Sequence, residues 1–157
     1  MLPNSFILCW LDMEWQDLVY SALSHTFQTK PYNYFVWIKP SAQGLQPGHN
    51  LDTATEFAWY ARKGNPLLNE ERVKNWTMQS AVRRVGRHPT EKPVPVYEYL
   101  LRPFGLENSK VLSLFAGAGN LGLAAHNKNM DPTLVDIDPQ WRDDFDRRVH
   151  EAKRPYR

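Results

Sequence analysis

The sequence predicts an α/β domain built on a mostly parallel sheet. Short apolar runs of the kind that form strands alternate along the chain with segments of helical periodicity. The C-terminal half contains one strand–helix–strand unit, and such units make neighbouring strands parallel. A chain of 157 residues is long enough to bury one core. We therefore expect a single domain over residues 1–157.

The first 64 residues predict three strands and one helix. Strands are expected at 5–11, at 33–40, where a proline ends the run, and at 55–64. A helix is expected at 13–27, because its apolar residues recur at helical spacing. The apolar run at 5–11 has no earlier element to cover it. We therefore expect the fold to be incomplete at its N-terminus, or to be completed by another chain.

A polar segment without a regular period follows at 65–87. Its second part has no acidic residue and carries five basic ones: Arg72, Lys74, Arg83, Arg84 and Arg87. A basic stretch of this kind can contact nucleic-acid phosphates, or it can be a solvated loop. Both interpretations remain open at this point.

Composition narrows the class of protein. The net charge of +2 does not by itself require a nucleic-acid partner. One cysteine, Cys9, excludes an internal disulfide framework and fits a reducing cytoplasm. No apolar run approaches the roughly 20 residues that span a bilayer, and no basic stretch precedes the first apolar run as in a secretion signal. We expect a cytoplasmic protein without a membrane partner.

The last 64 residues predict two strands and three helices. A helix is expected at 94–104, with a proline in its first turn. A strand at 110–115, a helix at 119–128 and a strand at 132–137 form the strand–helix–strand unit. A charged amphipathic helix is expected at 139–154.

Glycines spaced G-x-G-x-x-G lie in the turn of this unit, at Gly117, Gly119 and Gly122. Glycine lets the backbone approach a ligand, so a substitution at Gly119 would place a side chain in the ligand's volume. Asp136 or Asp138 follows Gly119 by 17 to 19 residues, the distance expected of a carboxylate that binds ribose hydroxyls. The pattern predicts a nucleotide-like cofactor. The alternative is that the glycines only allow a helix to pack closely on a strand.

Two cofactor classes fit this pattern, a dinucleotide and S-adenosylmethionine. A dinucleotide fold needs a second strand–helix–strand half to hold the nicotinamide or flavin. Only 21 residues follow Asp136. The chain therefore favours the smaller cofactor, S-adenosylmethionine. Separately, the sequence predicts no metal site.

Three motifs resemble the β class of amino-group DNA methyltransferases: HPTEKP at 88–93, FAGAGN at 115–120 and VDIDP at 135–139. Enzymes of this class transfer a methyl group from S-adenosylmethionine to adenine N6 or cytosine N4. The resemblance implies a Rossmann-like methyltransferase fold with helices on both faces of the sheet. It also implies double-stranded DNA as partner, a role in restriction-modification, and adenine N6 as the expected target.

The resemblance assigns functions to parts of the chain. Residues 1–64 would be the later strands of the catalytic half, 65–87 a variable DNA-recognition segment, and 88–157 the cofactor half. Ten residues would bind the cofactor: His88, Thr90, Lys92, Phe115, Ala116, Gly117, Gly119, Asn120, Asp136 and Ile137. Four basic residues would contact DNA: Lys39, Arg83, Arg84 and Arg87.

Each part of the cofactor would meet a different group of these residues. The loop 115–120 would surround the methionine and the sulfonium. Asp136 would hold the ribose hydroxyls, and Ile137 would lie against the adenine. The residues of 88–93 would close the pocket near the methionine carboxylate, which favours hydroxyl or ammonium donors and a helix N-terminus.

Three departures from the class pattern bear on activity. Ser113 stands where an acidic residue usually meets the methionine ammonium, and Leu134 stands where a glycine usually precedes the ribose acid. The catalytic tetrapeptide, Asp, Asn or Ser followed by Pro-Pro and an aromatic residue, is absent from the sequence. It accepts hydrogens of the reacting amino group and stacks on the flipped base. We therefore predict no catalytic residue here.

Two outcomes follow from the missing tetrapeptide. The chain alone would be inactive, and a second chain or segment would supply the catalytic loop. The alternative is a non-catalytic relative that binds nucleic acid or supports an active partner.

Overall fold

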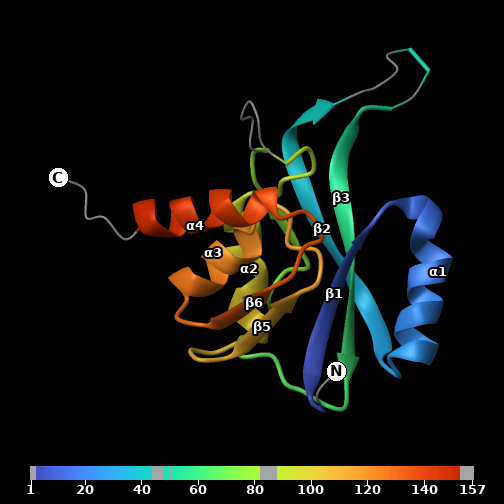
Figure 1. Cartoon of the computed structure of the whole chain (residues 1–157). Coiled ribbons are helices and arrows are strands. Elements are labelled where there is room, and N and C mark those ends of the chain that lie inside the picture. The colour runs from blue at the N-terminus through green and yellow to red at the C-terminus, as the bar shows by residue number, and fades with distance from the viewer. Residues whose placement is uncertain (1–2, 44–47, 50, 82–87, 153–157) are drawn as a thin grey trace. The chain divides into compact units, whose positions relative to one another are not determined.

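The part of the chain described by the computed structural model (Figure 1) comprises residues 3–43, 48–49, 51–81 and 88–152. The chain divides into two compact units, Met1–Ser80 and Ala81–Arg157. The division falls inside the basic segment 65–87. A single domain over the whole chain, with parts that end at residues 64 and 87, stays a prediction.

The first unit is built on a four-stranded sheet in the order β1-β3-β2-β4. Its strands are β1 (Ser5–Leu11), β2 (Lys30–Gln43), β3 (Thr53–Lys63) and β4 (Trp76–Met78). β1 and β2 are both antiparallel to β3, and β4 is parallel to β2. The α/β class is confirmed, but the expectation of a mostly parallel sheet is wrong for this unit. The connection between β2 and β3 is too short for a crossover helix, so the two strands form a hairpin.

Strands β2 and β4 differ from their predicted bounds. β2 continues past Pro40, because its pairing with β3 is irregular between Ile38 and Gln43 and an irregular ladder tolerates a proline. β4 lies in the polar segment 65–87, where no strand was predicted, since three residues are too few to show a period. The indole Nε1 of Trp37 donates a 2.8 Å hydrogen bond to the carbonyl of Gln79, just after β4.

The helix predicted before β2 is confirmed, and three helical geometries follow one another in it. A 3-10 turn (Met13–Trp15) leads into α1 (Gln16–Ser21), and a π-helical turn (Ala22–Thr26) ends it. Leu23 is buried in a cluster with Trp59 of β3. This contact fixes the helical segment to the sheet.

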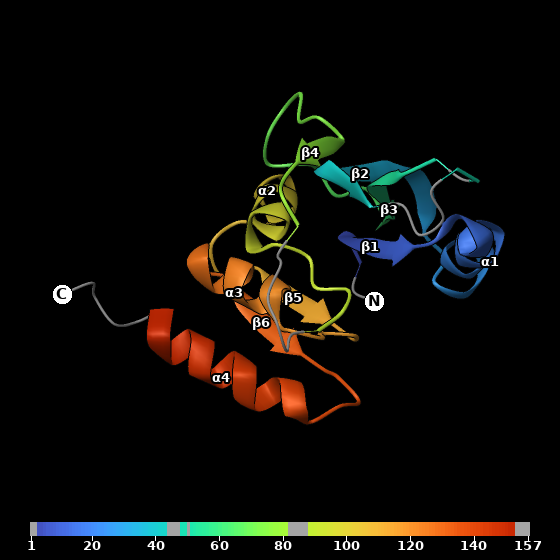
Figure 2. The same cartoon turned by 90° about the horizontal axis from the view of Figure 1, so that it is seen from above.

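The second unit contains the predicted strand–helix–strand arrangement, flanked by two further helices (Figure 2). Its elements are α2 (Val94–Phe104), β5 (Lys110–Ser113), α3 (Asn120–Asn127), β6 (Asp131–Leu134) and α4 (Gln140–Ala152). β5 and β6 pair in parallel, as expected. Helix α3 lies between α2 and α4 (Figure 2).

The core of the second unit lies between α2, α3 and the strand pair. Ala124 and Ala125 of α3 are fully buried, and their small side chains allow α2 to approach closely. Leu101 of α2 packs on them, and Val111 of β5 adds to the same cluster. Leu112, the next residue of β5, is exposed. Helices α2 and α3 therefore cover the same face of this strand pair.

Candidate cofactor-binding site

The glycine turn, residues 114–119, connects β5 to α3. The strands stay paired at its base, because the Ala116 N–H donates to the Val135 carbonyl at 2.9 Å and the Val135 N–H donates to the end of β5 at 2.8 Å. Gly117 and Gly119 have φ values of +49° and +73°, which other residues adopt only with strain. The turn lies at the carboxyl ends of two parallel strands, where open α/β sheets bind ligands.

Asp136 is the carboxylate that meets the glycine turn. Its Oδ2 accepts a 2.6 Å hydrogen bond from the Gly117 N–H, and its Oδ1 accepts one of 3.1 Å from the Asp138 N–H. The Gly117 N–H above all, then the Asp138 N–H and the nearby His88, hold the pKa of Asp136 below its ordinary value. The exposed carboxylate is therefore ionised at neutral pH.

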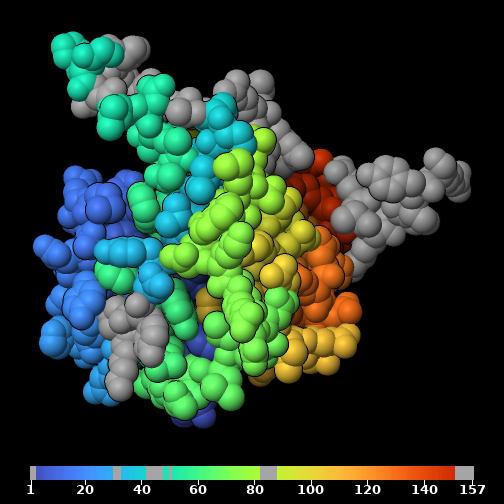
Figure 3. Space-filling model, turned by 180° about the vertical axis from the view of Figure 1, so that it is seen from behind, coloured from blue at the N-terminus to red at the C-terminus, as the bar shows by residue number. Residues whose placement is uncertain are grey.

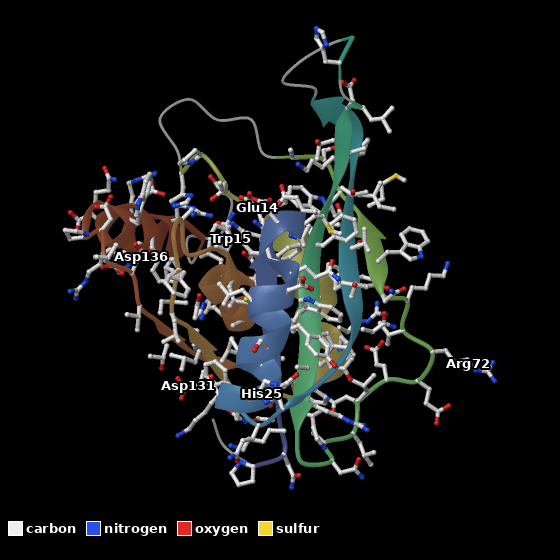
Figure 4. All side chains as sticks on the ribbon, turned by 90° about the vertical axis from the view of Figure 1, so that its right-hand side faces the viewer. Glu14, Trp15, His25, Arg72, Asp131 and Asp136 are labelled. Carbon is white, nitrogen blue, oxygen red and sulfur yellow. The ribbon has the colours of Figure 1, made fainter. Side chains whose placement is uncertain are left out.

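Asp138, the second acidic candidate, lies just before the beginning of α4. Asp138 Oδ1 accepts a 3.1 Å hydrogen bond from the Gln140 N–H at the beginning of α4. Such a bond satisfies one of the N–H groups that a helix leaves without an intrahelical partner. Figure 4 shows Asp136 and Asp131 at opposite ends of β6. The structure thus gives Asp136 the contact with the turn and gives Asp138 a capping contact.

His88, the first residue of the HPTEKP motif, lies on the glycine turn. A Cβ on Gly117 would be 3.2 to 3.4 Å from three atoms of the His88 ring. The ring also meets Trp141 of α4 edge-on, with centroids 5.0 Å apart. Its Nδ1 accepts a 3.3 Å hydrogen bond from the Thr90 N–H and lies 3.2 Å from Thr90 Oγ1. The motif therefore closes over Gly117, and Trp141 is a contact that the sequence analysis missed.

Asn120 joins the HPTEKP motif to the glycine turn. Its side chain is buried, and Nδ2 donates to the Lys92 carbonyl at 2.7 Å and to Glu91 Oε1 at 2.8 Å. Lys92 contributes its backbone to this contact. The asparagine amide thus serves the protein's own structure, and Glu91 is a second residue that the sequence analysis missed.

Two glycines of the motif give space to protein side chains. A Cβ on Gly119 would collide with the Phe145 ring of α4. The sequence had predicted that a side chain at this position would enter the volume of the ligand. A Cβ on Gly122 would lie 2.5 Å from Leu134 Cδ1. Close packing therefore accounts for both glycines, and Leu134 fits under α3. The amphipathic spacing of α4 was the sequence signal for Phe145.

Two apolar residues that were expected to contact the cofactor, Phe115 and Ile137, are exposed to solvent. Phe115 is 92% exposed and Ile137 is 100% exposed. Phe115 follows β5 and Ile137 follows Asp136, so both residues are close in sequence to the hydrogen bond between the glycine turn and the Asp136 carboxylate. An anchored carboxylate with apolar neighbours suits a ligand that has hydroxyl groups and an apolar ring. Ala116 and Ser113 at this edge are partly buried.

The four residues expected to contact DNA have different outcomes. Lys39 pairs with Glu56 at 2.9 Å, and its side chain is only 12% exposed. This placement argues against the expected phosphate contact. Arg83, Arg84 and Arg87 lie outside the described residues, and their role stays a prediction.

The loop between β3 and β4 lies on the surface of the first unit (Figure 3). Arg72 in this loop points away from the ribbon (Figure 4), and Lys74 lies 5.0 Å from the centre of the Trp76 ring. In the described ranges, no group of three or more His, Cys, Asp or Glu residues could hold a metal ion. None of the helices in these ranges has the length and apolarity that crossing a membrane requires.

Comparison with known proteins gives one family and several similar structures. The family model N6_N4_Mtase, described as DNA methylase, matches residues 3–145. M1.HpyAVI in complex with S-adenosylmethionine is 19% identical, with a TM-score of 0.81, over 94% of this chain and 76% of that chain. The cytosine-N4-specific PvuII DNA methyltransferase is 15% identical, with a TM-score of 0.75, over 90% and 62%. TTHA0409 of Thermus thermophilus, in complex with S-adenosyl-L-methionine, is 15% identical, with a TM-score of 0.71, over 99% and 72%.

Proposed function

Because the chain belongs to the DNA methylase family, we propose that its second unit binds S-adenosylmethionine and that the protein serves in methyl transfer to an amino group of a DNA base. One observation carries the proposal. Asp136 is fixed on the Gly117 N–H and remains exposed and ionised. A nucleoside with two free hydroxyls is the ligand that such a carboxylate binds well.

The residues around Asp136 fit the other parts of this cofactor. S-adenosylmethionine supplies an electrophilic methyl group on its sulfonium. Asp136 would accept hydrogen bonds from both ribose hydroxyls, and the exposed side chain of Ile137 would cover one face of the adenine. The first N–H groups of α3, at the positive end of the helix dipole, favour the methionine carboxylate. Two of the similar structures contain this cofactor.

Substitution of the carboxylate tests the proposal. Asp136→Asn keeps the size of the side chain and removes its charge, so we expect S-adenosylmethionine affinity to fall about tenfold or more in calorimetry. Asp138→Asn is the matched control, because an asparagine oxygen can still cap α4. Equal affinity in the two variants would contradict the assignment, and tighter binding of NAD by the wild-type chain would favour a dinucleotide.

We propose adenine N6 as the target, following the resemblance of the three motifs. The cytosine-N4-specific PvuII enzyme among the similar structures makes cytosine N4 the alternative. Nucleoside analysis of DNA from cells that express the protein with its natural partners would distinguish the two. N6-methyladenine is the expected product, and N4-methylcytosine would replace this part of the proposal.

We further propose that the chain alone does not complete the reaction, since no Asp, Asn or Ser followed by Pro-Pro and an aromatic residue occurs in it. The exocyclic nitrogen is a poor nucleophile unless its hydrogens are accepted as the methyl group arrives. Incubation with DNA and labelled S-adenosylmethionine should show cofactor binding without transfer. Transfer would refute this inference, and absence of cofactor binding would favour the non-catalytic module.

A further inference from the structure

Two side chains of α4 lie against the glycine turn, one turn of the helix apart: Phe145 and Arg148. Phe145 fills the space beside Gly119. The Arg148 side chain is 10% exposed, and its Nη1 donates a 2.6 Å hydrogen bond to the Ala118 carbonyl. Its Nη2 donates to Asn120 Oδ1. Arg148 thus holds the residue before Gly119 and the residue after it.

The chemistry of these partners fixes the orientation of Asn120. Arginine has only donors, so Asn120 must present its amide oxygen to Arg148. A backbone carbonyl only accepts, so Asn120 must present its amide nitrogen to Lys92. An asparagine can serve both sides at once, whereas aspartate and leucine cannot. A continuous chain of hydrogen bonds therefore runs from α4 through the glycine turn to the segment 88–93.

The charge of Arg148 adds to the positive end of the α3 dipole beside it. The Asp144 carboxylate, one helical turn earlier, lies 3.8 Å from the guanidinium and balances part of this charge. A cation at a helix N-terminus is unfavourable for that helix, and it favours an anionic group bound nearby. The position costs helix stability and suits a ligand with a carboxylate.

We propose that Arg148 is a positioning residue for the cofactor site. It holds the Ala118 carbonyl and the Asn120 amide, so that the glycine turn and the segment 88–93 keep the shape that binds the ligand. Affinity for S-adenosylmethionine then depends on a side chain of the last helix that need not touch the cofactor. The identity of this ligand rests on the proposed function; the effect on the turn does not.

Hydrogen exchange in the cofactor-free chain tests the effect on the turn. Arg148→Met keeps an apolar stem and removes both hydrogen bonds, so we expect the Gly117 and Gly119 amides to exchange about tenfold faster. Arg142→Met is the matched control, because this side chain of the same helix is 83% exposed. Unchanged exchange in a folded Arg148→Met variant would overturn the proposal.

Calorimetry tests the effect on the ligand. We expect Arg148→Met to weaken S-adenosylmethionine binding about tenfold. Arg148→Lys keeps the charge and one donor nitrogen, so we expect it to weaken binding less. Combining Arg148→Met with Asn120→Leu should weaken binding no further than the worse single variant, since both break the same chain of bonds. A lower Tm with unchanged affinity would assign Arg148 a merely structural role.

The two experiments separate this inference from the proposed function. A wild-type chain that does not bind S-adenosylmethionine refutes the function, while the exchange rates still decide whether Arg148 holds the turn. If Arg148→Met does not fold, the Arg148→Lys variant provides the same comparison. Exchange and affinity equal to wild type in that variant would overturn the proposal that the two guanidinium nitrogens hold the turn.

Discussion

Asp136 shows how an exposed group can be fixed. A surface carboxylate is usually free to rotate, but both oxygens of Asp136 accept backbone N–H groups, from Gly117 and from Asp138. Because these bonds favour the charged form, the pKa of Asp136 is lowered. The sequence offered two acidic candidates at this strand end. The contact with the glycine turn distinguishes them.

The lowered pKa of Asp136 predicts how binding depends on pH. The lowered pKa keeps this carboxylate ionised at a pH where an ordinary aspartate begins to take up a proton, and the ionised form is the one that accepts hydrogen bonds from both ribose hydroxyls. Affinity for S-adenosylmethionine should therefore change little through this group from neutral pH down to about pH 4 and fall below it. Calorimetry against pH, with circular dichroism to verify folding, measures this.

Asp136→Asn is the reference for that titration. This variant should bind S-adenosylmethionine weakly, and its affinity should not fall further at acidic pH, because the asparagine does not titrate. If affinity falls at acidic pH equally in the wild type and in Asp136→Asn, a group other than Asp136 causes the fall.

The close contact between Gly119 and Phe145 can be tested by substitution. Gly119→Ala should lower both Tm and cofactor affinity, because the new Cβ collides with the Phe145 ring. Adding Phe145→Ala removes the collision and should restore part of the loss. The strain of a positive φ, about 1–2 kcal/mol for a non-glycine residue, would remain. If cofactor affinity does not recover in the double variant, the result would support the original expectation that the side chain enters the ligand's volume.

Helix α3 is the element that places the glycine turn. One side packs through Ala124 and Ala125 on α2, and Gly122 accommodates Leu134 of β6. The sequence predicted this helix and both neighbouring strands, because each segment has a clear period. It did not predict the partners of each face. Leu134, which stands where the class usually has a glycine, packs under the helix.

The close approach of α2 and α3 depends on small side chains. Ala125→Leu should destabilise the protein by about 1–3 kcal/mol, because the larger side chain has no space in this core. His126→Leu is the matched control, since His126 is exposed on the same helix. Urea unfolding monitored by circular dichroism measures both. Equal free energies of unfolding would show that α2 can move away at little cost.

The two units carry different parts of the predicted sites. Every hydrogen bond described around the glycine turn comes from the second unit. The first unit supplies the antiparallel strands and Lys39, whereas the positions of Arg83, Arg84 and Arg87 fall in the second unit. The predicted DNA-contacting residues are therefore distributed over both units. Only Lys39 among them is described, and it is held in an ion pair.

The basic segment allows a test of DNA binding. Replacing Arg83, Arg84 and Arg87 together by Gln should weaken DNA binding and reduce the slope of log affinity against log salt by up to about 3, because each phosphate contact releases counterions. Lys39→Met should leave that slope unchanged, since Glu56 already balances its charge. A slope that is unchanged in the triple variant would favour the solvated-loop interpretation.

Four features could be read from the sequence alone: the elements with a period, the strand–helix–strand unit, the spacing from Gly119 to Asp136, and the resemblance to a methyltransferase class. These are local properties, because periodicity, turn chemistry and spacing are written along the chain. Three features required the folded chain: the hairpin of β2 and β3, the link that Asn120 makes between two motifs, and the contacts of Phe145 and Arg148 of α4 with the glycine turn. Such contacts join residues far apart in sequence, and side-chain packing and hydrogen-bond geometry select them.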